Sequence, residues 1–209
     1  MDNNYIFQYW EAIQNGTVTV GKWIKTIYKI LVNGLKSGKW DFDEEKANKA
    51  INFIENFCHH SEGRNDLLKL ELWQKAIVSA IFGIMDKRTG YRQFREVFIV
   101  VARKNGKTLF AAAIAAYMAY IDGEYGAKVY FLAPKLDQAD LVYDAFYQIV
   151  QADDELDSIT KKRRSDIYIK EFNTSVKKIA FNSKKSDGFN PQMVVNDEME
   201  AWQGDQGLK

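Results

Sequence analysis

Apolar residues recur at helical spacing through the first third of the chain. They stand three or four positions apart between Trp23 and Leu31, and again between Ala47 and Phe57. This spacing places them on one face of a helix, so it predicts an arm of two or three helices. The segment Ser61–Asp66 is rich in residues typical of loops. We therefore expect a helical arm at residues 1–65 and a second domain at residues 66–209.

The period of the apolar positions changes in the second domain. A third helix is expected from Leu67 to near Gly83, and Glu96–Ala102 (EVFIVVA) then forms a short apolar run rich in β-branched residues. Such a run is typical of a central parallel strand covered on both faces. Further elements are expected as helices over 107–121 and 136–150 and as strands over 128–133, 166–172, 177–182 and 193–196. Alternating strands and helices predict an α/β fold with right-handed crossovers and a mainly parallel central sheet.

The composition is that of an ordinary folded protein. The chain has 209 residues, of which 46% are hydrophobic and only two are proline. Its single cysteine, Cys58, has no partner for an internal disulfide, and no second cysteine completes a zinc-binding spacing with His59 and His60. These counts argue against a disulfide-stabilised protein and against a zinc knuckle.

Charge and hydropathy exclude few classes of function. The longest apolar run, Leu109–Ile121, is too short to span a bilayer, and Met1–Trp10 lacks the features of a secretion signal. We therefore expect a cytoplasmic protein with no membrane association. The net charge is +1, and the one conspicuous basic cluster is Lys161–Arg164. Contact with nucleic acid is thus permitted without being demanded.

A candidate phosphate-binding loop lies between the predicted strand at 96–102 and the helix that follows it. Its sequence is Arg103-Lys104-Asn105-Gly106-Lys107-Thr108. Backbone N–H groups and the positive end of the helix dipole converge at such a helix start, where they favour a phosphate group. Gly106 would let the backbone approach the ligand, Lys107 would reach the β- and γ-phosphate oxygens, and the Thr108 hydroxyl would ligate Mg²⁺. The segment therefore predicts a nucleoside triphosphate site.

The loop departs from the full P-loop pattern in one respect. The pattern has a glycine five positions before Gly106, and this chain has Val101 there. Arg103 and Lys104 add two cations that the pattern does not specify. The alternative interpretation is a turn between strand and helix with a solvated basic tip.

A pair of carboxylates follows the last predicted strand, Met193–Asn196. Asp197 is expected to hold Mg²⁺ or its water, and Glu198 to polarise the water that attacks the γ-phosphate. The alternative is a strand that ends in a solvated turn. The order of the motifs, with the phosphate loop upstream, favours a nucleotide site at the edge of one sheet.

These motifs and their surroundings resemble the ATPase domain of the terminase large subunits of tailed phages. The resemblance also covers Trp73–Gln74, Ile81–Gly83, Tyr91–Phe94, Ala133–Lys135, Gln138–Ala139, Asp187–Pro191 and Asn196–Glu198. In that family the loop Arg-Lys-Asn-Gly-Lys-Ser/Thr usually lacks the first glycine. The resemblance implies a three-layer αβα P-loop NTPase fold that binds ATP and Mg²⁺ through the loop residues Arg103, Lys104, Asn105, Gly106, Lys107 and Thr108.

The resemblance also implies roles for residues that spacing alone does not single out. It implies that Arg103 acts beside the γ-phosphate, together with Lys107 and Glu198, and that Gln74 and Trp73 contact adenine. Trp73 has an alternative as a core aromatic on an amphipathic helix. Gln74, its neighbour on the helix, need not share that burial.

The partners implied by the resemblance are double-stranded DNA, the terminase small subunit, the capsid portal protein and further copies of the chain in a ring. Arg163 or Arg164 would be the arginine that acts on a neighbouring subunit, and Lys161–Arg164 would track DNA phosphates, unless this run is a solvated surface. A coupling segment and a nuclease domain are expected in the full-length protein and are absent before Lys209, so we interpret the chain as truncated.

The predicted function is Mg²⁺-dependent ATP hydrolysis that drives viral DNA into a capsid, in the cytoplasm of the host cell. The alternatives are a helicase-like P-loop translocase and a catalytically incomplete fragment that docks on partner proteins.

Overall fold

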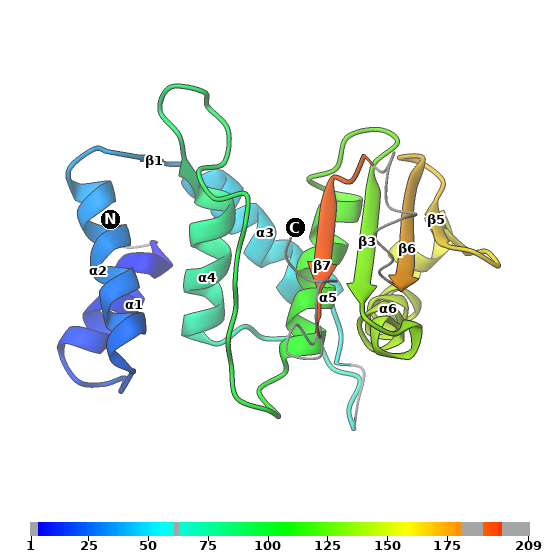
Figure 1. Cartoon of the computed structure of the whole chain (residues 1–209), viewed down its shortest axis with the longest axis horizontal. Helices are drawn as coiled ribbons and strands as arrows, with labels where there is room; N and C mark the ends of the chain where they lie inside the picture. The colour runs from blue at the N-terminus through cyan, green and yellow to red at the C-terminus, as the bar shows by residue number, and fades with distance from the viewer. Residues whose placement is uncertain (1–3, 61–62, 181–189, 198–209) are drawn as a thin grey trace. The chain divides into compact units, whose positions relative to one another are not determined.

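The computed structural model describes residues 4–60, 63–180 and 190–197. The chain divides into two compact units (Figure 1), a helical unit of Met1–Asn56 and Lys69–Val100, and a sheet unit of Phe57–Leu68 and Val101–Lys209. The division follows internal contacts, whereas a domain boundary concerns independent folding. The predicted boundary between residues 65 and 66 therefore stays a prediction.

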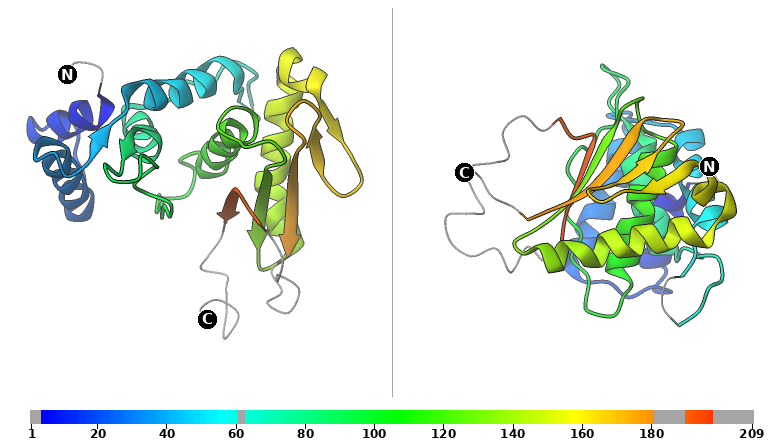
Figure 2. Two further views of the ribbon diagram at one scale, coloured as in Figure 1. Left: turned by 90° about the horizontal axis from the view of Figure 1, so that it is seen from above. Right: turned by 90° about the vertical axis from the view of Figure 1, so that its right-hand side faces the viewer.

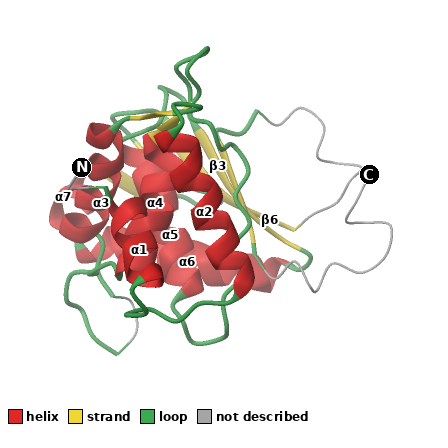
Figure 3. Cartoon of the chain, turned by 90° about the vertical axis from the view of Figure 1, so that its left-hand side faces the viewer, coloured by secondary structure: helices red, strands yellow, loops and turns green. Residues whose placement is uncertain are grey.

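The helical unit confirms the helices expected from the apolar spacing. Its helices are α1 (Tyr5–Gln14), α2 (Lys22–Lys36), α3 (Glu44–Phe57) and α4 (Leu72–Gly83), and its strands are β1 (Asp41–Phe42) and β2 (Ile84–Met85), which pair antiparallel. Helix α1 packs against both α2 and α4, and α2 runs along the outside of the unit (Figure 3). Tyr9 and Tyr28 meet edge to face in this core, with ring centroids 4.7 Å apart. Gly34 on α2 leaves no room for a side chain against Trp40.

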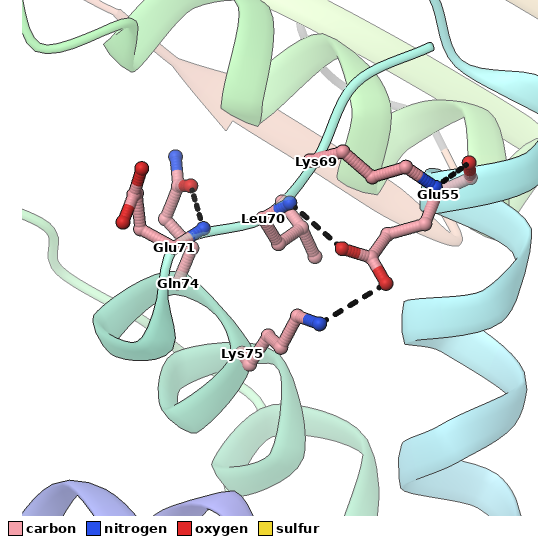
Figure 4. Close-up of polar contacts among 6 residues, drawn as sticks. All are labelled: Glu55, Lys69, Leu70, Glu71, Gln74 and Lys75. Carbon is pink, nitrogen blue, oxygen red and sulfur yellow. Dashed lines mark hydrogen bonds and ion pairs between the residues drawn. The ribbon is translucent and has the colours of Figure 1, made fainter.

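Polar contacts from α3 fix the segment that leads into α4 (Figure 4). The Glu55 carboxylate accepts a hydrogen bond from the Leu70 N–H at 2.9 Å and pairs with the Lys75 ammonium at 3.1 Å. The first turn of α4 is closed by a capping box, in which the Gln74 side chain accepts from the Glu71 N–H at 2.9 Å. These bonds satisfy donors that a helix start would otherwise leave without a partner.

The sheet unit contains a five-stranded mixed sheet. Its strands are β3 (Lys128–Ala133), β4 (Thr160–Lys162), β5 (Ile167–Ile169), β6 (Thr174–Ala180) and β7 (Met193–Asn196), in the order β4-β5-β6-β3-β7. Strand β3 pairs parallel with β6 and with β7, and Val129 lies opposite both Val176 and Met193. The β4–β5 and β5–β6 pairs are antiparallel. A mainly parallel sheet is therefore not confirmed among the described strands.

Three helices complete the sheet unit, namely α5 (Lys107–Tyr120), α6 (Leu136–Ala152) and α7 (Asp154–Ile159). Helices α5 and α6 contact both the sheet and each other, so they form one layer on one face of it (Figure 2). Phe131 of β3 packs in this interface against Tyr143 and Phe146 of α6. The alanine-rich α5 is almost wholly buried after its first turn. A second helical layer, which the predicted three-layer fold requires, is not seen in the described part of the unit.

The predicted strand at Glu96–Ala102 is wrong for this structure. The segment has no strand conformation, and Val97, Phe98 and Val100 are 49%, 76% and 75% exposed. A strand needs a neighbour for its backbone N–H and C=O groups, and this segment pairs with no strand of the described sheet. The predicted strands 166–172 and 177–182 correspond to β5 and β6, which pair antiparallel as a hairpin, and residues 181–182 lie outside the described residues.

Within the described ranges, no helix is both long and apolar enough to cross a membrane.

Candidate functional site

The loop before α5 makes its tight turn without the first glycine of the P-loop pattern. Lys104 and Gly106 adopt left-handed backbone conformations, with φ of 66° and 68°, whereas Val101 does not. The Asn105 side-chain amide donates hydrogen bonds to the carbonyls of Ala102 at 3.0 Å and Arg103 at 3.3 Å. The conformation that favours glycine is thus needed at position 106 and not at position 101.

The start of α5 is exposed and open to a ligand. Gly106 is its N-cap residue and supplies no side-chain hydrogen bond to the first turn. Arg103 and Lys104 are exposed just before it. The first N–H groups of a helix and its dipole favour an anion at this point. The segment therefore combines positive charge with backbone donors at the surface of the sheet unit.

The structure brings Lys107 and Asp197 together. The Lys107 Nζ lies 2.7 Å from a carboxylate oxygen of Asp197. Lys107 is the first residue of α5, and Asp197 directly follows β7, where its N–H donates to the Leu132 carbonyl at 3.3 Å. The carboxyl end of β7 thus faces the start of α5. This is the edge at which α/β sheets bind ligands.

The two charged side chains differ in exposure. The Asp197 side chain is 10% exposed and the Lys107 side chain 37% exposed. A charged group that is largely removed from water needs a partner, and the Lys107 ammonium lies beside the Asp197 carboxylate. The pair thus places an ammonium group and a carboxylate side by side at the start of α5.

A magnesium ion fits this set of residues. No group of three or more His, Cys, Asp or Glu side chains is gathered for a metal within the described ranges. Mg²⁺ bound with a nucleotide needs few protein ligands, because phosphate oxygens and waters complete its six positions. Asp197 offers one carboxylate, and Thr108, half-buried in the first turn of α5, offers a hydroxyl. Glu198 lies outside the described residues.

The predicted adenine-contacting residues belong to the helical unit. Gln74 is 8% exposed, and its carbonyl oxygen is engaged in the capping box of α4 (Figure 4). Trp73 is half-buried against the core of the helical unit. Gln74 does not share the half-buried state of Trp73, because it is the more buried of the two and its carbonyl oxygen is engaged in the cap. The spacing Glu71-x-x-Gln74 was the signal for this bond.

One residue of the basic cluster Lys161–Arg164 binds within the β4–β5 hairpin. Arg163 donates two hydrogen bonds of 2.6 Å to the carboxylate of Asp166, which is 3% exposed. The guanidinium also lies 4.0 Å from the ring centroid of Tyr168. The bonds to Asp166 raise the pKa of Arg163. Arg164 is exposed. Of the two candidates for an arginine that acts on a neighbour, Arg163 is thus the one held in place.

Comparisons with known proteins bear on the family and the fold of the chain. Residues 72–209 match the family model described as "Terminase large subunit, ATPase domain". No curated protein matches the chain. The fold is similar to that in the crystal structure of the HK97 bacteriophage large terminase, with a TM-score of 0.65 and 24% sequence identity. That match covers 76% of this chain and 32% of the other, so this chain spans about a third of the solved protein's length. The matched family model covers well over half of the sequence, and the chain therefore belongs to the family of terminase large subunit ATPase domains.

Proposed function

We propose that this chain binds ATP with Mg²⁺ at the start of α5 and hydrolyses it. The observation that carries the proposal is the Lys107–Asp197 pair, which sets a cation and a buried carboxylate 2.7 Å apart beside a helix start. A magnesium nucleotide has the complementary arrangement of an anionic phosphate chain and a bound cation. Membership in the terminase ATPase family supports the choice of ATP.

Lys107 and Asp197 would exchange partners on nucleotide binding. Lys107 would leave Asp197 for the β- and γ-phosphate oxygens. Asp197 and the Thr108 hydroxyl would hold the metal or its water. Bound Mg²⁺ would neutralise charge on the phosphates as the γ-phosphoryl group is transferred. The loop N–H groups, Arg103 and Lys104 add positive charge on the side open to solvent.

Two further residues are assigned to catalysis. Glu198 follows Asp197 directly, and we assign it the role of the base that orients the attacking water. Arg103 is assigned to the γ-phosphate. Its exposed position in the loop leaves it able to reach a ligand without breaking a packed contact. We keep Gln74 and Trp73 as candidate adenine contacts, and we place the start of the ATPase domain near residue 66.

The larger role follows from the family. We propose that ATP hydrolysis here serves to move double-stranded viral DNA into a capsid. In that role the chain would act in the host cytoplasm, in a ring of copies, with the terminase small subunit and the portal protein as partners. The support is the family match together with the likeness to a phage large terminase.

Titration of the 209-residue chain with a fluorescent ATP analogue, with and without Mg²⁺, tests the site. Lys107→Ala should abolish measurable binding, because the cation that meets the phosphates is gone. Lys128→Ala is the matched control, since this exposed lysine begins β3 at the opposite end of the strand. Unchanged nucleotide affinity in Lys107→Ala would refute the site.

A second variant separates binding from hydrolysis. Glu198→Gln keeps the size of the side chain and removes its basicity, so it should bind ATP normally and lose turnover in a phosphate-release assay. Normal hydrolysis by this variant would place the base elsewhere. Lack of nucleotide binding by the unaltered chain would favour a non-catalytic fragment instead.

A further inference from the structure

Helix α2 carries more apolar surface than the core of the helical unit covers. Tyr28, Leu31 and Val32 are buried against α1 and its neighbours. Trp23, Ile24, Ile27 and Ile30 are 70%, 38%, 49% and 55% exposed, and we call these four residues the α2 face. The apolar residues of α2 therefore form two surfaces, one buried in the core of the helical unit and one exposed.

The α2 face is continuous along the helix. Trp23, Ile27 and Ile30 are spaced by four and three residues, so their side chains lie one above another on the same side. Single exposed apolar residues are common on proteins, whereas a contiguous group of large ones marks an interaction surface. A tryptophan flanked by isoleucines is typical of the apolar centre of a protein interface.

The charge on α2 restricts the partner. The helix carries Lys22, Lys25, Lys29 and Lys36 and has no acidic residue. The Lys22 ammonium lies 4.9 Å from the centroid of the Trp23 ring, so positive charge borders the apolar surface directly. A second copy of α2 would bring eight lysines to one contact, and like charges oppose this. Isoleucine side chains offer neither hydrogen bonds nor aromatic stacking to a nucleic acid.

We propose that the α2 face is a docking site for an acidic amphipathic helix of a partner protein. The apolar side of that helix would cover Trp23, Ile27 and Ile30, and its carboxylates would face the lysines. Amphipathic helices bind apolar surfaces through residues spaced three and four apart, as these three are. The surface belongs to the helical unit and does not depend on the nucleotide site.

The test uses the full 209-residue chain and a defined probe. The probe is a synthetic, fluorescein-labelled helical peptide with leucines on one face and glutamates along both flanks. A second peptide with lysine at every glutamate position is its comparison. Fluorescence anisotropy should detect saturable binding of the glutamate peptide alone. The double variant Trp23→Ser/Ile27→Ser should weaken binding roughly tenfold or more, because it removes the apolar centre of the contact. Lys25→Glu/Lys29→Glu should weaken it as well.

A matched control and four contrary outcomes make the result decisive. Leu141→Ser removes an exposed leucine of similar exposure, 57%, from α6, and it should leave binding unchanged. Circular dichroism should be the same for all variants, since the altered side chains are exposed. Equal binding of the lysine peptide, or no loss in the Trp23/Ile27 variant, would overturn the proposal. So would preferential binding to phosphatidylglycerol vesicles, or a concentration-dependent dimer that the double variant abolishes.

Discussion

Replacing Asp197 by asparagine should uncouple nucleotide binding from magnesium. In the ligand-free protein the Lys107 ammonium lies 2.7 Å from the Asp197 carboxylate. A phosphate group that binds Lys107 must therefore displace Asp197. Asp197→Asn keeps the shape of the side chain and removes its charge. ATP without magnesium should then bind more tightly, since Lys107 is released and a buried negative charge no longer faces the phosphates. The additional affinity that magnesium gives should fall.

The size of the effect follows from the exposure of the pair. A fully buried pair would be coupled by several kcal/mol, and a surface pair by less than about 1 kcal/mol. With side chains that are 37% and 10% exposed, this pair lies between those limits. We expect about 1–2 kcal/mol after allowing for solvent screening, which corresponds to roughly five- to thirtyfold tighter binding of magnesium-free ATP.

Calorimetric titration with ATP in EDTA, and again in excess Mg²⁺, measures the affinity for ATP without and with magnesium. Asp144→Asn makes the same change of charge at an exposed position on α6 and should leave both affinities unaltered. The double variant Lys107→Ala/Asp197→Asn should bind magnesium-free ATP no better than Lys107→Ala alone, because the tighter binding acts through Lys107. An Asp197→Asn protein that binds ATP more weakly in EDTA, or that keeps the full magnesium enhancement, would refute this account of the site.

Two stability predictions follow from the same structure. Asp166→Ala should lower the free energy of unfolding by about 1–2 kcal/mol, because it removes the buried carboxylate that accepts two hydrogen bonds from partly exposed Arg163. Arg164→Ala should change the free energy of unfolding by less than about 0.5 kcal/mol. Urea unfolding measures both variants, and equal effects would contradict the role given to Asp166. Phe98→Ser should cost less than about 0.5 kcal/mol because the ring is 76% exposed, whereas Phe131→Ala should cost about 3–5 kcal/mol because that ring is 1% exposed. A large loss of unfolding free energy in Phe98→Ser would instead support the buried strand that the sequence predicted.

The helices were predictable because the period of their apolar positions is a local property. The run at 96–102 shows the limit of that reasoning, because β-branched apolar residues indicate that a segment favours a strand and not that a neighbouring strand exists. Likewise, the parallel pairing of β3 with β6 and with β7 joins segments far apart in the sequence, which composition does not reveal.

Part of the candidate site was predictable from the sequence and part of it was not. The approach of Lys107 to Asp197 was predictable, because a loop that opens a helix and a strand that ends in a carboxylate meet at one edge of a sheet. The low exposure of Asp197 was not, since it depends on how β7 lies beside β3. The commitment of Arg163 to Asp166 left only a weak signal, an opposite charge three residues away.

The short strand β4 has a consequence for the behaviour of the protein in concentrated solution. It ends the described sheet with three residues, and Lys161 and Lys162 are exposed on it. An edge strand presents free backbone groups to which a strand of another molecule is able to add. The short length of β4 and its two ammonium groups disfavour such pairing, so these lysines limit association at this edge of the sheet, independently of any contact with DNA.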